Sequence, residues 1–553
     1  MLLRSIKAIP ISQWALSTIL AVYIGCILNA VNLYRAYTSG GIHDGILIAH
    51  YAVAMTFFSL FVLEFSAIFG IWFYKLLAAL LLIFSATASF YMIFYNVVVG
   101  YGVIASVFQV TDVKFAGESV SYGLFVWTFF VGVLPALLIT HINVRKRFWH
   151  NIRRPAAGLL TIALLFGAVF ITTQTTKNVD KVAKKAFSGQ DKYTAVPSGI
   201  MTSSFVPTNW LSGLIMYGYQ EFGGNQTELD NPAELFEYSA PASLDDTYVV
   251  FILGETTRGD HMQILGYDRE TNPLLANEKN LVAFQGRSCD TATLLSMRCM
   301  FVREGAASTE QHREVSENNV FYVLNQLGFS VELFAMQSEV WFYNTIGASS
   351  YEIREALGAA HDVNKTNFDD MVLIDYMNTS ISRHPKGKHV VFLHTKGSHN
   401  TYSQRYPREF AHFLPECLSI NDSCSVESLI NSFDNSVRYV DLFLDTIFEE
   451  LKDKKAIVFY ASDHGESIAE NRHFHATPKE IAPEEQFNIP ILVWASDKYL
   501  EVPNNQQLFS NLQRRQKNNP EAKHEDIYDS ILGCLGYTSG DGGLDPNNNW
   551  CNE

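Results

Sequence analysis

Long apolar runs separated by short polar segments dominate the first third of this 553-residue chain. Each run approaches or exceeds the ~20 residues that a helix needs to cross a lipid bilayer. A buried helical core of a soluble protein is the alternative, which the scarcity of charges between the runs disfavours. The pattern therefore predicts five transmembrane helices, at Trp14–Leu33, Ile46–Trp72, Leu76–Val99, Tyr122–Thr140 and Ala157–Thr173.

A different pattern begins near residue 246, where short apolar runs typical of buried strands alternate with helical stretches. Such alternation favours a mostly parallel sheet that is covered by helices on both faces. We therefore predict a transmembrane domain at 1–176, an amphipathic connector at 177–245 and an α/β domain at 246–553. The predicted strands are Tyr248–Leu253, His389–Leu393, Ala456–Tyr460 and Ile489–Trp494.

Charge is unevenly distributed between these parts. Residues 1–176 carry ten Lys or Arg and four Asp or Glu, a net +6, so the remainder of this −15 chain carries −21. Arg4 and Lys7 precede the first apolar run, and five arginines and lysines at 145–154 follow the fourth. Because cytoplasmic loops are rich in Lys and Arg, the N-terminus is predicted to be cytoplasmic and everything after Thr176 to lie outside.

The acidic balance and the absence of a basic tail exclude a nucleic-acid-coating protein.

Six of the seven cysteines lie in the outer part of the chain, and they form close couples in the sequence. An oxidising compartment permits disulfides, and an even number there favours disulfides over a metal cluster. Pairing by proximity is one of several connectivities that six cysteines allow. The couples are Cys289 with Cys299, Cys417 with Cys424, and Cys534 with Cys551.

Acidic and histidine side chains follow three of the four predicted strands. The carboxyl ends of parallel strands meet at one edge of a sheet, where ligands gather. A set of Glu, Asp and His ligands suits zinc. A core histidine and a helix-capping aspartate are the alternative interpretation, which recurrence at three strand ends makes weaker. The residues are Glu255, His394, His399, Asp463, His464, His473 and His475.

The segment from Cys289 to Cys299 is typical of a helix start held by a disulfide. It contains two threonines, Thr291 and Thr293. A threonine hydroxyl becomes a useful nucleophile only when a base or a metal lowers its proton affinity. The amide groups at a helix N-terminus would then bind a phosphoryl group. Simple helix capping by both threonines is the alternative.

Four motifs together connect the chain to a known family: GETTR at 254–258, CDTAT at 289–293, KGSH at 396–399 and SDHGES at 462–467. With them the chain resembles the bacterial phosphoethanolamine transferases, which are inner-membrane members of the alkaline phosphatase superfamily. The resemblance covers essentially the whole chain, including five spans before a periplasmic catalytic domain. RCMFVR at 298–303, HTKGSHNTYSQRYPR at 394–408 and GCLGYTSGDGG at 533–543 resemble the branch that modifies the Kdo sugar of Kdo-lipid A.

The resemblance implies roles for individual residues. The zinc ligands of the family fall on Glu255, Thr293, Asp463 and His464. Thr293 matches the nucleophile that becomes transiently phosphorylated. His399 and His475 match histidines that contact the phosphoryl group or a second metal, and His473 is the alternative to His475.

Two segments depart from the pattern of the family. Relatives that modify lipid A place Asn and Lys after a central strand, where this chain has Gln337 and Glu339 and no Lys. Many relatives also carry Asn and Glu in the outward loop after the third span, where Ser106 and Gln109 lie nearby. These departures concern contacts with the headgroup and the acceptor. The candidate substrate-binding residues are Ser106, Gln109, Gln337, Glu339, His394, Lys396 and His473.

By resemblance, the chain is expected to transfer phosphoethanolamine from phosphatidylethanolamine to a Kdo hydroxyl of lipopolysaccharide. It would do so through zinc and a covalent phospho-threonine, as a monomer in the bacterial inner membrane. Calcium is a second cofactor hypothesis, because an outer part with a net charge of −21 must meet an anionic acceptor. Added positive charge on lipopolysaccharide would protect the envelope against cationic peptides.

Other functions stay open at this point. A lipid A phosphate is an alternative acceptor, and phosphatidylglycerol is an alternative donor for a phosphoglycerol transferase of the same superfamily. A sulfatase would need a Cys/Ser-x-Pro-x-Arg motif, which the segment from Cys289 to Cys299 lacks. A non-catalytic membrane sensor is disfavoured because all four positions that match metal ligands are filled.

Overall fold

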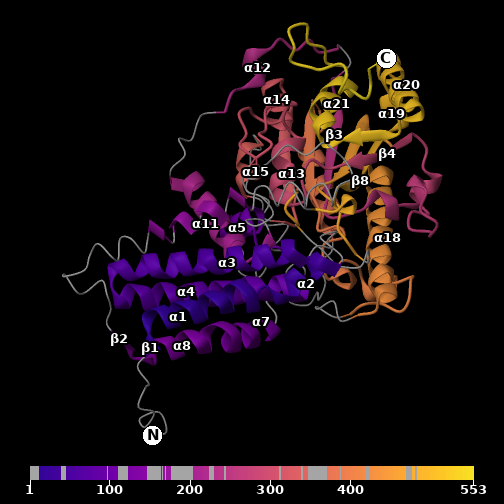
Figure 1. Ribbon diagram of the computed structural model, residues 1–553. Helices are drawn as coiled ribbons and strands as arrows, with labels where there is room; N and C mark the ends of the chain where they lie inside the picture. Colours follow the sequence, from indigo (N-terminus) through magenta and orange to yellow (C-terminus); the bar gives the residue numbers. More distant parts are fainter. Residues whose placement is uncertain are drawn as a thin grey trace. The chain divides into compact units, whose positions relative to one another are not determined.

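The chain forms two compact units, Met1–Ala105 with Lys114–Gly223, and Ser106–Val113 with Gly224–Glu553. Both are drawn in the computed structural model of Figure 1. The structure describes residues 11–38, 45–95, 97–109, 122–145, most of 163–175, 204–222, 229–241, 244–310, 313–337, 340–346, 370–386, 388–418, 424–468, 476–479 and 482–552.

The first unit contains, among its described residues, four helical spans long and apolar enough to cross a membrane. They match the first four predicted spans, and each contains π-helical or 3₁₀ turns or a break between helices. The fifth predicted run, Ala157–Thr173, falls largely outside the described residues, so the count of five stays a prediction. The spans are Gln13–Tyr37, Gly45–Phe69, Ile71–Phe94 and Tyr122–His141. They contain α1 (Gln13–Val22), α2 (Ala30–Thr38), α3 (Gly45–Ser66), α4 (Ile71–Phe90), α7 (Tyr122–Trp127) and α8 (Leu134–His141).

Part of the predicted connector packs against this bundle. The connector contains helix α11 (Thr208–Phe222), whose Trp210 indole N–H donates to Ser85 of α4 over 3.2 Å. Just before α11, the Asn29 amide bonds both the N–H and the C=O of Val206. Buried polar groups in a membrane bundle need partners inside the protein, which these contacts supply. The earlier connector segment Lys177–Phe187 lies outside the described residues.

The second unit is built on a seven-stranded sheet in the order β5-β6-β3-β7-β8-β4-β9. The first four strands are mutually parallel, β8 runs antiparallel to both β7 and β4, and β9 is parallel to β4. The four predicted strands are present as β3, β6, β7 and β8, and the mostly parallel sheet is confirmed. The bounds are β3 (Tyr248–Gly254), β4 (Leu281–Arg287), β5 (Ser330–Ala335), β6 (His389–His394), β7 (Ala456–Ser462), β8 (Asn488–Ala495) and β9 (Glu521–Lys523).

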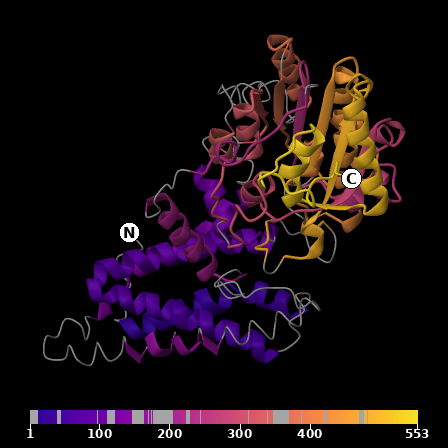
Figure 2. The same ribbon diagram turned by 90° about the horizontal axis from the view of Figure 1, so that it is seen from above.

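Helices cover both faces of this sheet, as continuous apolar strands require. On β3, Val249 and Phe251 pack into a core with α13, α14, α20 and α21, whereas Val250 and Ile252 pack against α17 and α18. Figure 2 shows the C-terminal helices, in yellow, beside the orange strands. The bounds are α13 (Thr293–Met300), α14 (Val320–Gln326), α17 (Val372–Arg383), α18 (Val426–Leu451), α20 (Pro503–Asn518) and α21 (Ile527–Cys534). Shorter elements are β1 (Ile11–Ser12), β2 (Val144–Arg145), α5 (Tyr101–Gln109), α12 (Pro232–Leu235), α15 (Val340–Thr345) and α19 (Asp497–Leu500).

Three disulfides close loops in this unit. They join the cysteines that are near in sequence, so proximity gives the observed pairing. Each bridge lies at a loop or a helix end rather than inside a strand. The pairs are Cys289–Cys299, Cys417–Cys424 and Cys534–Cys551.

Candidate active site

Two neighbouring strands bring the first candidate ligands together. β3 and β7 are parallel and in register at their carboxyl ends, where Gly254 lies opposite Ser462. The next residues, Glu255 and Asp463, therefore leave the same edge of the sheet side by side. The Asp463 N–H donates to the Gly254 carbonyl over 3.0 Å, so the ladder continues one step beyond the strands.

Backbone contacts orient the side chains that follow. Asp463 Oδ1 accepts the N–H groups of Thr256 and His464, at 3.0 and 2.7 Å. Asp463 Oδ2 is a buried oxygen with no hydrogen-bond partner among the described residues. His464 Nδ1 lies 2.8 Å from the Gly465 carbonyl, which assigns its proton to Nδ1 and a lone pair to Nε2. That Nε2 lies 3.4 Å from Asp463 Oδ2 and 3.8 Å from Glu255 Oε1.

This convergence is suited to a divalent cation. One ligand atom from each of Glu255, Asp463 and His464 lies within 4.8 Å of the others, and all three side chains are buried. Two carboxylates this close repel each other in a low-dielectric interior unless positive charge is supplied. Two oxygens and an imidazole nitrogen are a ligand set that zinc accepts. The residues present therefore fit a zinc ion.

The candidate nucleophile lies beside this group. Thr293 is the first residue of α13, and its hydroxyl donates to Glu255 Oε2 over 3.3 Å. The other candidate, Thr291, is buried and donates its hydroxyl to the Thr477 carbonyl. The structure thus separates the two threonines. It brings Thr293, which the resemblance implies is the nucleophile, to the group of Glu255, Asp463 and His464, and it turns Thr291 away.

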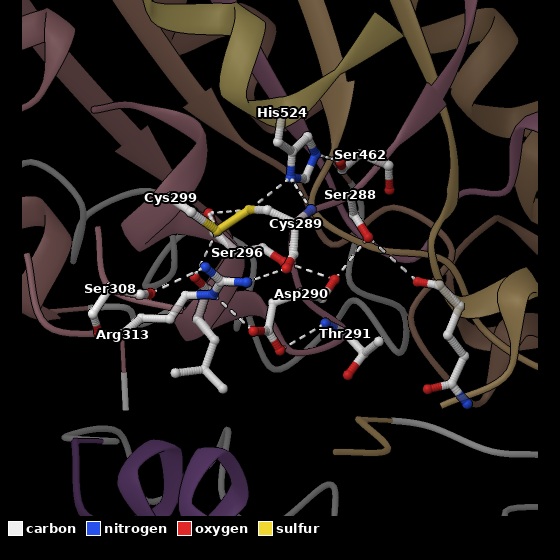
Figure 3. The surroundings of a disulfide bond; sticks show 12 residues. Ser288, Cys289, Asp290, Thr291, Ser296, Cys299, Ser308, Arg313, Ser462 and His524 are labelled. Carbon is white, nitrogen blue, oxygen red and sulfur yellow. Dashed lines mark hydrogen bonds and ion pairs between the residues drawn. A yellow bond between two sulfur atoms is a disulfide. The ribbon is translucent and has the colours of Figure 1, made fainter. Parts of the chain in front are cut away.

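A buried ion pair and a disulfide hold the segment that carries Thr293 (Figure 3). Arg313 Nε lies 2.8 Å from Asp290 Oδ2, and the same guanidinium donates to the Cys289 carbonyl. Both side chains of the ion pair are almost fully buried. Cys289 is bonded to Cys299, which lies in the last turn of α13. The loop before the helix and the helix itself are therefore cross-linked.

His524 connects this segment to β7, the strand that precedes the candidate ligands Asp463 and His464. Its Nδ1 accepts the Cys289 N–H at 3.3 Å, and its Nε2 donates to the Ser462 carbonyl at 2.9 Å (Figure 3). The imidazole is fully buried, and that burial lowers the pKa of His524 to about 4. A neutral ring with one donor and one acceptor matches both contacts. No motif in the sequence marks His524, because its role depends on two residues that are far away in the chain.

The KGSH turn packs directly on Glu255, the first candidate ligand. Gly397 has φ +50°, and a Cβ there would lie 2.7 Å from the Glu255 carbonyl oxygen, so only glycine fits. Ser398 N–H donates to the same carbonyl over 2.9 Å. The Asp370 carboxylate accepts the backbone N–H groups of Lys396 and Gly397, at 2.7 and 2.9 Å. This turn also carries His399, which is partly buried.

Three of the predicted substrate-binding side chains are buried near the site. Gln337 Nε2 donates to Glu255 Oε2 over 2.8 Å. His394 is fully buried and contacts the Tyr343 hydroxyl at 2.8 Å, and burial lowers the pKa of His394 to about 3. Lys396 is buried as well.

Several predicted residues fall where the structure gives no side-chain description. Glu339, His473 and His475 lie outside the described residues. Ser106 and Gln109 belong to α5, but the described features of that helix do not include their side chains. The roles assigned to these five residues therefore stay predictions.

A second group of similar composition lies at the other edge of the sheet. Glu332 is the third residue of β5 and His389 the first residue of β6, so both are near the amino ends of parallel strands. His384 follows α17 and stacks on His389, with ring centroids 4.2 Å apart. Ligand atoms of the three residues lie within 4.8 Å of one another.

This second group does not fit a metal ion. The two nitrogens of His389 each contact a serine hydroxyl, Ser330 and Ser380, at 2.7 Å. Glu332 already pairs with the Arg383 guanidinium at 2.8 Å. A cation next to Arg383 would be repelled, and stacked rings do not direct their lone pairs at one point. The group is a satisfied hydrogen-bond network.

Comparisons with known proteins agree with the geometry. A family model described as "Sulfatase" matches residues 247–537, and a model described as "Phosphoethanolamine transferase EptA/EptB" matches residues 57–211. The chain is 46% identical to the Kdo(2)-lipid A phosphoethanolamine 7''-transferase of Escherichia coli K12, over 99% of this chain and 98% of that protein. The protein of the same name from Salmonella typhimurium is 45% identical, with the same coverage. The chain belongs to the phosphoethanolamine transferase family.

A solved structure supports this assignment over the full length. The integral membrane lipooligosaccharide phosphoethanolamine transferase A from Neisseria meningitidis matches with a TM-score of 0.81 and 25% identity, over 97% of this chain and 98% of that one. This phosphoethanolamine transferase is therefore a membrane-embedded enzyme with a catalytic unit of the sulfatase type. The resemblance drawn from the four motifs is confirmed.

Proposed function

We propose that this transferase moves phosphoethanolamine from phosphatidylethanolamine to a hydroxyl of the Kdo sugar in lipopolysaccharide. The observation that carries the acceptor is the 46% identity over the full chain to an enzyme named for Kdo(2)-lipid A, against 26% to the enzyme named EptA from the same species. The observation that carries the chemistry is the Thr293 hydroxyl beside Glu255.

Four residues would hold the metal: Glu255, Asp463 and His464, with Thr293 as the fourth ligand. Zinc bound there would lower the proton affinity of the threonine hydroxyl and would offset negative charge on the phosphoryl oxygens. Burial of the first three side chains strengthens both effects, because electrostatic interactions are weakly screened in a dry site.

The reaction has two steps. Thr293 Oγ1 attacks the phosphorus of phosphatidylethanolamine, an O–P bond forms, and the bond from phosphorus to the glycerol oxygen breaks. Diacylglycerol leaves with a proton, and phosphoethanolamine stays on Thr293. A Kdo hydroxyl then attacks the same phosphorus, the Thr293–phosphorus bond breaks, and the proton of the Kdo hydroxyl passes to Thr293 Oγ1. The N-terminal amides of α13 bind phosphoryl oxygens in both steps, while His399 and His475 balance charge and carry protons.

The same proposal assigns the remaining residues. Ser106, Gln109, Glu339 and His473 contact the headgroup or the acceptor. Burial of His394 and Lys396 favours a different role, support of the KGSH turn beneath the site. The six bonded cysteines hold loops of the catalytic domain in an oxidising compartment.

The proposed topology follows the distribution of basic residues. The protein lies as a monomer in the bacterial inner membrane with five spans, its N-terminus cytoplasmic and its catalytic domain periplasmic. The domains are 1–176, 177–245 and 246–553.

Calcium would bridge the acidic catalytic part, net −21 after residue 176, and the anionic acceptor. Unchanged transfer after calcium is chelated and zinc retained would exclude the calcium bridge.

Mass spectrometry of lipopolysaccharide tests the central proposal. Cells would express the wild type, Thr293→Ala or Thr291→Ala, and mild acid would separate lipid A from the Kdo-containing core. We expect phosphoethanolamine on the core with the wild type and with the Thr291 control, and none with Thr293→Ala. The same addition on lipid A would keep the chemistry and change the acceptor. A phosphoglycerol mass would instead change the donor to phosphatidylglycerol.

A further inference from the structure

Gln337 is not a member of the candidate metal group, but its side chain contacts one member, Glu255. It lies two residues beyond the end of β5, a strand that is separated from β3 by β6. Its side chain is 5% exposed, and its amide nitrogen lies 2.8 Å from Glu255 Oε2. The resemblance to the family implies a substrate contact for Gln337, because relatives have different residues in this segment. The structure points its donor at a protein carboxylate instead.

The two oxygens of Glu255 have separate surroundings. Oε1 faces His464 Nε2 at 3.8 Å, within the group suited to a cation. Oε2 accepts both the Gln337 amide and the Thr293 hydroxyl, at 2.8 and 3.3 Å. A carboxylate can rotate about its terminal bond, which would exchange these oxygens. A hydrogen bond from a buried amide fixes one orientation.

The chemical nature of the donor also matters. A glutamine amide is neutral and does not ionise, so it orients Glu255 without neutralising it. A lysine or arginine at this position would compete with a cation for the same negative charge. Outer contacts of this kind orient metal ligands and tune their affinity.

We infer that Gln337 is a positioning residue: it fixes the Glu255 carboxylate so that one oxygen faces the metal and the other faces Thr293. The inference rests on the proposed zinc and threonine chemistry. It replaces the expected contact between Gln337 and substrate, and it predicts that Gln337 governs metal affinity and turnover rather than donor binding.

The test compares variants of the full-length protein in detergent. Gln337→Met keeps the length of the side chain and removes the donor, and Gln337→Asn keeps the amide but shortens its reach. Asn505→Leu is the matched control, because it removes a buried amide on α20 that donates to the Tyr499 carbonyl on α19. Competition with a chromogenic chelator gives zinc affinity, and transfer from labelled phosphatidylethanolamine gives kcat and KM.

We expect both Gln337 variants to lose zinc affinity and kcat by about 10-fold or more, the effect of removing an outer contact of a metal ligand. The KM for phosphatidylethanolamine should stay near that of the wild type, and Asn505→Leu should bind zinc normally. Normal zinc affinity with a raised KM would make Gln337 a substrate contact and overturn the inference, as would wild-type values throughout. A wild type that binds no zinc would overturn the proposed function itself, and the inference with it.

Discussion

The two edges of the catalytic sheet carry groups of nearly the same composition and opposite character. At the carboxyl edge, Glu255, Asp463 and His464 direct ligand atoms at one another, and Asp463 Oδ2 has no hydrogen-bond partner among the described residues. At the amino edge, Glu332 and His389 find serine, arginine and histidine partners. Residue types therefore do not define a metal site. A group suited to a metal is instead one whose lone pairs converge on one point with no hydrogen-bond donor between them.

The cause of this difference is local. Backbone N–H groups occupy one oxygen of Asp463, and the Gly465 carbonyl fixes the tautomer of His464, so the remaining atoms are directed inward. At the amino edge, side chains rather than backbone supply the partners. Side-chain hydroxyls and a guanidinium satisfy every ring nitrogen of His389 and the Glu332 carboxylate.

Substitution of one acid at each edge gives the sharpest separation. Asp463→Asn should lower transfer by more than the about 10–100-fold that outer contacts of a metal ligand contribute, because it would remove a proposed ligand itself. Glu332→Gln, at the other edge, should leave transfer near the wild-type rate. Phosphoethanolamine transfer in detergent measures both. Equal losses of transfer activity in the two variants would mean that the residue types of a group, and not its geometry, determine whether transfer needs it.

Stabilisation by zinc should depend on the group at the carboxyl edge and not on the group at the amino edge. A zinc concentration 100-fold above its Kd should stabilise the wild type by about 2.7 kcal/mol, because the folded state alone binds the ion. Glu332→Gln should keep the resulting rise in Tm, and Asp463→Asn should lose it. Thermal unfolding of metal-stripped protein, with and without added zinc, measures the difference. A rise in Tm that survives in Asp463→Asn would place the ion elsewhere.

The amino-edge network should contribute to stability without any metal. Glu332→Gln removes a buried carboxylate from Arg383 and His384, both of which keep some access to solvent. The loss should therefore be about 1–2 kcal/mol, well below that for a fully buried ion pair. The fall in Tm of the metal-stripped variant measures it. An unchanged Tm would show that the network is dispensable.

A fall in pH should lower the stability of the folded protein through His389 at the amino edge. Burial lowers the pKa of His389 to about 4 from its ordinary 6.5, so the unfolded chain binds a proton first as the pH falls. Its contribution to stability is complete above pH 6.5 and is lost as the pH drops toward 4, by less than about 1 kcal/mol at pH 6. Tm measured between pH 7.5 and 5.5 should fall less steeply in His389→Gln. Parallel slopes would contradict this assignment.

Much of the fold follows from local patterns. The strands later observed as β3, β6, β7 and β8 are continuous apolar runs, which makes them visible without any alignment. The strands β4 and β5 are less visible, because β4 alternates around Gln285 and β5 contains Glu332. The antiparallel direction of β8 also escapes the sequence, since the direction of a strand depends on its neighbours.

The residues of the candidate site also differ in how visible they are in the sequence. Motifs adjacent to strand ends identify Glu255, Asp463 and His464, because topology places such residues at one edge. The choice of Thr293 over Thr291 required the resemblance or the structure. Gln337 and His524 act through hydrogen bonds to residues distant in the chain, which no local pattern encodes.

The disulfide between Cys289 and Cys299 has a consequence for when the enzyme becomes active. The bridge closes a small ring of chain, and Thr293 lies within that ring. A newly made chain in a reducing compartment carries the same threonine in an open segment, without the cross-link that sets its place beside Glu255. Oxidation of the two cysteines should therefore be needed to hold Thr293, the proposed nucleophile, in its position beside Glu255.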